Sequence, residues 1–426
     1  MKFLRITSLV FLPFIALALG FQIGMQYEQR EMSQEQARLE QMFTVASGTG
    51  AFIGDPEKEV DLSLLWSVWR LLQQNYIEPK EIMTENMVYG AVTGLVDGVG
   101  DPYTLFMTPK ETKQFHDGLS GDLEGIGAQL DEQNGAIVVV TPVKGSPAEK
   151  AGLLPRDIIT EVNGAKISGM KLEEIVLQIR GPKGTKVTLT VVREGELKPL
   201  TMTITRQNIH IPSVESKVET TSIGNVGILS INQFGDDTVT LAQKELMKYP
   251  KNLKALILDL RGNGGGYLEG AVDLVSMFVK EGLVVTVHRR DATPEEHRVN
   301  GAVILDSALP IVVLVNGGSA SAAEITAGAL KDLGRAILIG TQTFGKGTVQ
   351  EVIDLPGGSS LRVTIAKWLT PSGHDLGKKG ITPDVIIDRT IEEYKAGKDP
   401  QMDRAKAWLE GKKDVTAKKT ATGAVK

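Results

Sequence analysis

The chain has 426 residues, of which 42% are hydrophobic and 23% charged, so it is long enough for two or three globular domains. Its formal net charge of −5 provides no basic excess, which argues against a nucleic acid partner. The sequence has no cysteine, which excludes disulfides, thiol catalysis and thiolate metal sites. Its five histidines are scattered without metal-ligand spacing, so we expect no metal site.

Residues 1–25 predict an export signal or a membrane anchor. A short basic start precedes the almost wholly apolar stretch 6–21, ITSLVFLPFIALALGF. The apolar character continues to Met25, a length that approximates one membrane span. We expect residues 3–25 to anchor the chain in the inner (cytoplasmic) membrane, with the remainder in the periplasm or another extracytoplasmic space. The alternative is a cleaved signal, with ALA at 16–18 as the cleavage site, and a soluble protein.

Two segments follow before the first β-rich region. Residues 26–58 are polar and then rich in Gly and Ala, which is typical of a linker. Residues 59–117 predict a helical region, because apolar residues such as Leu64, Leu65 and Val68 fall at helical spacing. The breaker-containing stretches EPKE and GDPYT interrupt this pattern.

Residues 118–206 predict a compact, mostly β module. Short apolar strands are expected at 136–143, 157–164 and 186–194, separated by Asn-Gly turns. One amphipathic helix fits at 170–181.

Residues 207–395 predict an α/β domain. Apolar strands alternate with helices here, which indicates βαβ units on a parallel or mixed sheet. Residues 396–426 predict a charged C-terminal tail that is partly disordered. Within the α/β domain, the expected strands are 253–260, 283–289, 310–315 and 335–340, with helices at 267–282 and 320–333, and TVQEVIDL and SLRVTIAKWL add two later strands.

Two serines stand in a glycine-rich turn between the predicted strand 310–315 and the predicted helix 320–333. Ser321 and Glu324 form an S-x-x-E capping box, so capping is the plain interpretation of Ser321. Ser319 is placed to cap equally well, which would leave Ser321 free. A strand, a tight turn and a helix also expose a side chain at the carboxyl edge of a sheet, beside N–H groups that favour an oxyanion. The sequence of this turn therefore leaves two interpretations of Ser321 open, a helix cap and a nucleophile.

Lys346, between two glycines, is a candidate general base for such a nucleophile. The stretch from Gly340 resembles a phosphate-binding loop, but Gly347 replaces the required Ser/Thr and a strand pattern follows, which disfavours nucleotide binding. A lysine acts as a base if burial lowers its pKa from about 10.4. His374 is the alternative base, in a loop with no evident orienting acid. Gln350 would face the same side as Lys346 in an extended strand and help to position the amine.

Several motifs together resemble the carboxyl-terminal processing proteases, also called tail-specific proteases. These are Ser/Lys-dependent endopeptidases with an inserted PDZ domain. The resemblance covers about residues 60–390, and it rests on DPYT, GIGAQL, GSPAEKAGLLPRDIITEVNG, LILDLRGNGGG, the SASAAE to FGKGTVQ stretch, and WLTPSGHDLGKKGITPDV. Two departures, Gly for the usual Pro in GNGGG and Ala for the common Ser in SASAAE, remove no catalytic side chain.

The resemblance implies a role for each motif residue. The fold would be a multidomain α/β and β protein with a helical N-terminal region, a PDZ-like domain and a crotonase-like protease core. Ser321 would be the nucleophile, Lys346 the base and Gln350 the third member. The backbone N–H groups of the oxyanion hole would come from Ala322 and from Gly265 or Gly266. A peptide C-terminus would bind the PDZ loop of Gly125, Ile126, Gly127 and Ala128.

We therefore expect an exported serine endopeptidase that cleaves proteins near their C-terminus and needs no cofactor. Its partners would be protein or peptide tails, and the membrane through its N-terminal segment, while a homo-oligomer or an adaptor protein is left open. The alternative is a non-catalytic PDZ-type adaptor or scaffold at the membrane. Retention of the three catalytic side chains argues against that alternative.

Overall fold

The computed structural model describes residues 60–119, 122–133, 135–143, 145–170, 172–377 and 379–412. The predicted anchor and linker, and residues 413–426 of the predicted tail, lie outside these ranges. Within the described ranges, no helix is both long enough and apolar enough to cross a bilayer.

The chain divides into two units, of which the first contains the residues up to Ile82 together with 290–292. Its described elements are helix α3 (Ser63–Asn75) and the 3-10 turn η1 (Pro79–Glu81). Helix α3 is strongly amphipathic, but none of its residues is buried within the structure. Most of its apolar residues are exposed, including Trp66.

The second unit contains residues 83–289 and 293 onward, and it begins with the rest of the predicted helical region. This segment is not entirely helical, because a short strand, β1, lies between its helices. Phe106 and Met107 of this strand are buried, and β1 pairs antiparallel with a strand more than 250 residues later. Local periodicity could not reveal that partner. The elements are α4 (Thr84–Asp97), β1 (Leu105–Met107) and α5 (Pro109–Leu119).

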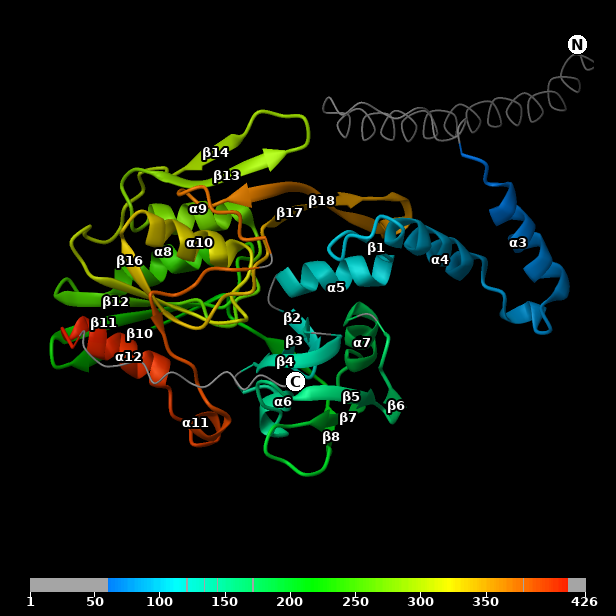
Figure 1. The fold of residues 1–426 in the computed structure, drawn as a ribbon, viewed down its shortest axis with the longest axis horizontal. Coiled ribbons are helices and arrows are strands. Elements are labelled where there is room, and N and C mark those ends of the chain that lie inside the picture. Colours follow the sequence, from blue (N-terminus) through cyan, green and yellow to red (C-terminus); the bar gives the residue numbers. More distant parts are fainter. Residues whose placement is uncertain are drawn as a thin grey trace, which may run out of the picture. The chain divides into compact units, whose positions relative to one another are not determined.

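The predicted β module forms a small antiparallel sheet (Figure 1). It has its own apolar core. The sheet order is β3-β4-β5-β7-β8, with β6 paired to β5, so β3 lies at an edge. The predicted strands and helix are confirmed as β4, β5, β7 and α7, while the others were missed. Their bounds are β2 (Asp122–Gly125), β3 (Ala128–Gln133), β4 (Ala136–Pro142), α6 (Pro147–Lys150), β5 (Ile158–Val162), β6 (Ala165–Lys166), α7 (Leu172–Ile179), β7 (Lys186–Val192), β8 (Leu200–Thr205) and β9 (Gln207–His210), which pairs with β2.

The α/β domain is built on a six-stranded sheet with the order β10-β11-β12-β15-β16-β19. All pairs from β11 to β19 are parallel, as the alternation of strands and helices predicts, and β10 adds an antiparallel edge. The central strands are buried on both faces, so they are nearly continuous apolar runs. The strands are β10 (Val214–Thr221), β11 (Gly224–Ile231), β12 (Leu253–Asp259), β15 (Ile311–Val315), β16 (Ala336–Gly340) and β19 (Val385–Ile386).

Helices cover both faces of this sheet (Figure 1). One face packs against α8 (Thr238–Lys248), α9 (Leu268–Ser276) and α10 (Ala322–Asp332), and the other against α12 (Pro400–Leu409). The short helix α11 (Ile391–Lys395) precedes α12.

The prediction of a tail from residue 396 is wrong for its first part, which forms helix α12. Ala405 of this helix is fully buried, and Met402, Trp408 and Leu409 pack against the same cluster. These residues recur at the three- and four-residue spacing of a helix face. The high Lys and Ala content masks that pattern when composition alone is considered.

A second sheet of the α/β domain has the order β1-β18-β13-β14, with β17 also paired to β18. The predicted strand 283–289 is present as β13, but it belongs to this antiparallel sheet and not to the parallel one. An apolar run indicates a buried strand without specifying its neighbours. The remaining bounds are β13 (Leu283–Arg289), β14 (Glu295–Arg298), β17 (Thr348–Asp354), η2 (Pro356–Gly358) and β18 (Ser360–Leu369).

Candidate active site

Three loops meet at the carboxyl ends of β12, β15 and β16, and we name them the glycine loop (261–266), the serine turn (316–321) and the lysine loop (341–347). Asn316 joins the first two, because its Oδ1 accepts the N–H of Gly262 at 2.8 Å and of Gly318 at 3.0 Å. Loops at this edge of a parallel sheet are where α/β proteins place their functional sites.

The two serines of the serine turn have different tasks. Ser319 is fully buried, and its Oγ donates to the carbonyl of Leu260 at 2.8 Å while it accepts the N–H of Asn316 at 3.0 Å. The suggestion that Ser319 caps the helix is therefore wrong. It fastens the serine turn to the end of β12, and Ser321 occupies the cap position of α10.

Ser321 has a backbone conformation that an ordinary helix cap does not need. Its φ is 54° and its ψ is −117°, whereas a cap residue usually lies in the β region. Left-handed φ values are costly for residues with a Cβ and concentrate at functional sites. The capping box with Glu324 is also present, so the cap interpretation is confirmed, and the role of Ser321 as a nucleophile stays a prediction.

Gly265 packs directly against Ser321. A Cβ on Gly265 would lie 2.7 Å from Ser321 Cβ and 3.1 Å from the Ala322 nitrogen, so only glycine fits. The backbone of the glycine loop is thus packed directly against the backbone at the start of α10.

Lys346 is half-buried in the lysine loop. Burial, reinforced by the positive charge of Arg362, lowers the pKa of Lys346 to about 8. A useful fraction of the amine is therefore neutral near physiological pH, as a general base requires. No helix follows the loop, since β17 begins at Thr348, which agrees with the exclusion of a phosphate-binding loop.

Glu324 joins the serine turn to the lysine loop. Its Oε2 accepts the backbone N–H groups of Ser321 and Lys346, both at 2.9 Å. Its Oε1 accepts Thr343 Oγ1 at 2.5 Å and the N–H of Gly345 at 2.8 Å. Burial raises the pKa of Glu324, and these four donors act in the opposite direction. Sequence reasoning treated Glu324 only as the capping partner of Ser321.

Among the hydrogen bonds of the described residues, none joins Ser321 Oγ to Lys346 Nζ. His374 lies elsewhere, because its Nδ1 is 2.7 Å from Ser372 Oγ, which also donates to Asp332 at 2.5 Å. Asp332 is the last residue of α10, and Ser321 precedes the first. The alternative base is thus at the opposite end of the helix from the serine.

The two glycines predicted for the oxyanion hole are not equivalent. The N–H of Gly265 donates to Asn263 Oδ1 at 2.8 Å, so in this structure it is not available to a ligand. For Gly266 and Ala322, we find no acceptor for the N–H group within the described ranges. Of the two glycines, this arrangement favours Gly266 as the donor, because Asn263 already accepts the N–H of Gly265.

Within the part of the chain that the structure describes, no hydrogen bond joins Gln350 to Lys346, so the role of Gln350 stays a prediction. Strand β17 begins at Thr348, and the pairing of Val349 with Ala366 and of Gln350 with Thr364 places an extra residue on β18. Lys346 precedes the strand by two residues, so the alternation of side chains along β17 does not by itself place Lys346 on the same face as Gln350. The Gln350 amide instead donates to Thr348 Oγ1 at 2.8 Å and to Thr364 Oγ1 at 3.3 Å.

The predicted peptide-binding loop joins β2 to β3. Gly127 has a φ of 75°, and a Cβ there would lie 2.5 Å from Ser146 Cβ. The carbonyl of Ile126 accepts the N–H of Ala148 at 2.8 Å, which holds the loop to α6. The N–H groups of Ile126 and Gly127 have no acceptor among the described residues.

Edge strand β3 also contacts the serine turn. Gln129 Nε2 donates to the carbonyl of Gly318 at 3.3 Å, while its buried Oε1 has no hydrogen-bond partner among the described residues. Sequence reasoning missed Gln129, since nothing in its local pattern distinguishes it from other strand residues.

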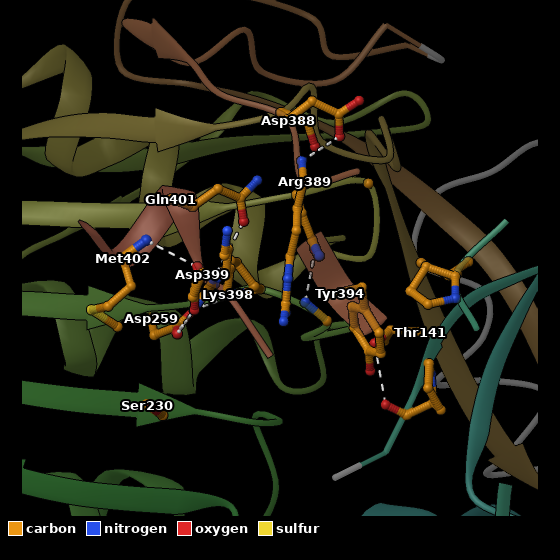
Figure 2. Close-up of a pocket in the computed structure, with 18 of the residues that line it drawn as sticks. Thr141, Ser230, Asp259, Asp388, Arg389, Tyr394, Lys398, Asp399, Gln401 and Met402 are labelled. Atoms are coloured by element: carbon orange, nitrogen blue, oxygen red, sulfur yellow. Dashed lines mark hydrogen bonds and ion pairs between the residues drawn. The ribbon is translucent and has the colours of Figure 1, made fainter. Parts of the chain in front are cut away.

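A large pocket of about 1170 Å³ is lined by residues of the β module, the α/β domain and helices α11 and α12. Figure 2 shows Asp259, Asp399 and Gln401 grouped within it, and Arg389 near Tyr394. The Arg389 guanidinium lies 4.3 Å from the Tyr394 ring centroid. None of the three predicted catalytic side chains lines this pocket, but residues of all three loops do, namely Arg261, Gly262, Asn316, Gly317 and Thr341, so the pocket adjoins the predicted site.

Comparison with known proteins supports this architecture. The family model for the PDZ domain matches residues 138–193, and that for Peptidase family S41 matches residues 225–387. The solved photosystem II D1 C-terminal processing protease is 30% identical with a TM-score of 0.63, covering 76% of this chain and 92% of that one.

Two curated relatives are named "Probable CtpA-like serine protease". The one from Staphylococcus aureus (strain MSSA476) is 41% identical over 332 residues, which are 78% of this chain and 65% of the relative. The one from Staphylococcus epidermidis is 39% identical over 333 residues, covering 78% and 66%. The chain thus spans about two thirds of the length of these relatives.

The fold and the matched domains define a peptidase architecture that includes a PDZ domain. The chain belongs to peptidase family S41. The α/β domain is hereafter called the protease core.

Proposed function

We propose that this chain is a serine endopeptidase that cleaves proteins near their C-terminus, with Ser321 as nucleophile and Lys346 as general base. The observation that carries the proposal is the arrangement around Glu324, whose buried carboxylate binds the N–H groups of both residues. It holds a conformationally strained serine and a lysine of lowered pKa on two adjoining loops.

In the proposed reaction, Ser321 Oγ attacks the scissile carbonyl while neutral Lys346 accepts the hydroxyl proton. The ammonium then returns this proton to the leaving amine, which leaves an acyl ester on Ser321. Water, deprotonated by Lys346, hydrolyses the ester and restores the serine. The N–H of Ala322, at the start of α10, supports the developing oxyanion together with a glycine-loop N–H.

The PDZ domain is proposed to capture the free C-terminus of the substrate. The N–H groups of Ile126 and Gly127 suit a carboxylate, and edge strand β3 suits an added peptide strand. Because Gln129 of β3 contacts Gly318 of the serine turn, a captured tail would lie beside the loops of the protease core.

Export and membrane anchoring through residues 3–25 are also part of the proposal. The full-length chain should fractionate with membranes and resist carbonate extraction, whereas a chain lacking residues 1–25 should be active and soluble. Release of the full-length chain with a new N-terminus near residue 19 would indicate a cleaved signal instead.

Labelling with a fluorophosphonate tests the catalytic assignment. The wild-type chain should be labelled and should cleave an internally quenched peptide with a free apolar C-terminus. Ser321→Ala should lose both properties and remain folded. A wild-type chain that binds the peptide without labelling or cleavage would instead support the adaptor alternative.

Amidation of the same peptide tests the recognition step. The free acid should be cleaved with a higher kcat/KM than the amide, and deletion of residues 118–206 should remove this difference. Equal cleavage of the two peptides by the intact chain would exclude carboxylate capture.

A further inference from the structure

The turn before β1 lies against the side chain of Lys346. Tyr103, in the DPYT motif, places its ring centroid 4.9 Å from Lys346 Nζ. At this distance the ring face attracts an ammonium and limits where the amine can lie. The motif therefore does more than end a helical region, because it supplies a wall of the candidate active site.

Arg362 on β18 is bound to the same turn. Its Nε donates to the carbonyl oxygen of Tyr103 at 3.1 Å. The register places Arg362 opposite Leu105 of β1, so strand pairing holds the guanidinium beside the turn. Tyr103 thus contacts two cations, Lys346 through its ring and Arg362 through its carbonyl.

The charged groups around Lys346 come from three elements. Asp101 of the turn and Glu324 of α10 favour the ammonium, whereas Arg362 of β18 disfavours it. Asp101 is partly buried, but hydrogen bonds from Thr104 and Thr364 lower its pKa, so it is an anion at neutral pH.

Tyr103 itself does not titrate near neutral pH. Burial raises the pKa of Tyr103, and the carboxylates of Asp131, Asp101 and Glu324 raise it further. Its phenol is therefore neutral over the range in which Lys346 changes charge, and its effect on Lys346 comes from the ring.

We propose that Tyr103 and Arg362 are positioning residues for Lys346: the ring of Tyr103 fixes the amine, and the charge of Arg362 favours its neutral form. The inference rests on the proposed function, in which Lys346 is the general base. It assigns roles to two residues from segments more than 250 positions apart, which the pairing of β1 with β18 brings together.

The charge of Arg362 is tested by the pH dependence of kcat/KM, measured with the full-length chain and the internally quenched peptide. Arg362→Gln keeps a donor for the Tyr103 carbonyl and removes the charge. Loss of this positive charge stabilises the ammonium form of Lys346. The pH at which activity rises should therefore increase by about half a unit to one unit. The rate at pH 7 should fall about three- to tenfold, with the alkaline plateau unchanged.

Arg362→Lys is the matched control, because it retains the positive charge. Its profile should stay close to that of the wild type. An unshifted profile in Arg362→Gln, or an equal shift in both variants, would overturn the role of the Arg362 charge.

The ring of Tyr103 is tested by Tyr103→Leu, with Tyr103→Phe as the control that keeps the ring. Loss of the ring removes an attraction for the ammonium, so the activity rise should move to lower pH, opposite to Arg362→Gln. Tyr103→Leu should also lower kcat more than it changes KM, because the Lys346 amine is held less firmly in position. A purely structural role would reduce the amount of folded protein without moving the profile. Tyr103→Met provides a second ring-free variant if Tyr103→Leu does not fold.

Lys346→Ala separates this inference from the proposed function. If Lys346→Ala is inactive while the Arg362→Gln and Tyr103→Leu profiles match the wild type, the positioning roles are wrong and the general base stands. If Lys346→Ala keeps wild-type activity with the same pH rise, Lys346 is not the base and both proposals are wrong.

Discussion

Two parts of the candidate active site, the surroundings of Ser321 (the serine side) and the surroundings of Lys346 (the lysine side), are held in place in different ways. The serine turn is held mainly by neighbouring residues and by the adjoining end of β12, through Asn316 and Ser319. The lysine side draws on distant segments, because Tyr103, Glu324 and Arg362 all act on Lys346. The position of the nucleophile is thus a local property of a strand, a turn and a helix. The protonation state of the base is a property of the tertiary structure.

Replacing Lys346 should have the largest effect and break the lysine side completely. Lys346→Ala removes the base and should lower kcat/KM by about 10²- to 10⁴-fold. Lys346→Arg should be nearly as inactive, since a guanidinium stays protonated. His374→Ala is the control and should lower the rate modestly at most. Peptide cleavage measured across pH 6–10 checks this, and an inactive His374→Ala with an active Lys346→Ala would contradict the assignment.

Replacing Glu324 should disturb both sides together. Glu324→Gln places an NH₂ group where two N–H or O–H donors now point, which costs about 1–3 kcal/mol of folding stability. Displacement of Ser321 and Lys346 should also lower kcat, by about 10²-fold if the shift approaches 1 Å. Thermal unfolding and peptide cleavage measure the two effects. A stable and fully active Glu324→Gln would show that the two sides are positioned independently.

Replacing Ser319 should affect stability more than catalysis. Ser319→Ala loses the hydrogen bonds to Asn316 and Leu260 in a fully buried position, which should cost about 1–3 kcal/mol. The folded fraction should keep most of its activity, because Ser321 remains in place. Urea unfolding and active-site titration distinguish the two quantities. Inactivity of a fully folded Ser319→Ala would make Ser319 the candidate nucleophile.

Replacing Gln350 should have the smallest effect. Its side-chain amide donates hydrogen bonds to Thr348 and Thr364. Thr364 in turn hydrogen-bonds Asp101, whose charge acts on Lys346, so we expect Gln350→Ala to affect Lys346 indirectly. One neutral hydrogen bond corresponds to about 1 kcal/mol, or about fivefold in rate. Steady-state kinetics at the alkaline plateau provide the comparison. A loss as large as that of Lys346→Ala would indicate that Gln350 contacts the amine in the substrate complex.

The local parts of the structure could be predicted from the sequence. Strands β12, β15 and β16 are buried apolar runs, and the helix after the serine turn carries its own cap, so pattern and capping signals agree. The same signals place Ser321 at the carboxyl edge of a sheet. The partial burial of Lys346 is also predicted, from Phe344, Val349 and the two flanking glycines.

The nonlocal parts could not be predicted in this way. The pairing of β1 with β18 joins residues far apart in the chain, and it determines which groups surround Lys346. The extra residue of β18, which sets Thr364 opposite Gln350, depends on the pairing of two strands. The hydrogen bond from Gly265 to Asn263 depends on the exact conformation of the glycine loop, which four nearby glycines leave undetermined in the sequence.

The backbone of Ser321 has a consequence for how an inactive form should be made. Alanine removes the hydroxyl but keeps the Cβ, and so keeps the strain of a φ of 54°. Glycine would remove both, so the two inactive forms should differ in how rigidly the turn holds its shape. Ser321→Ala is thus the better substrate trap, because it preserves the turn that a bound polypeptide would meet.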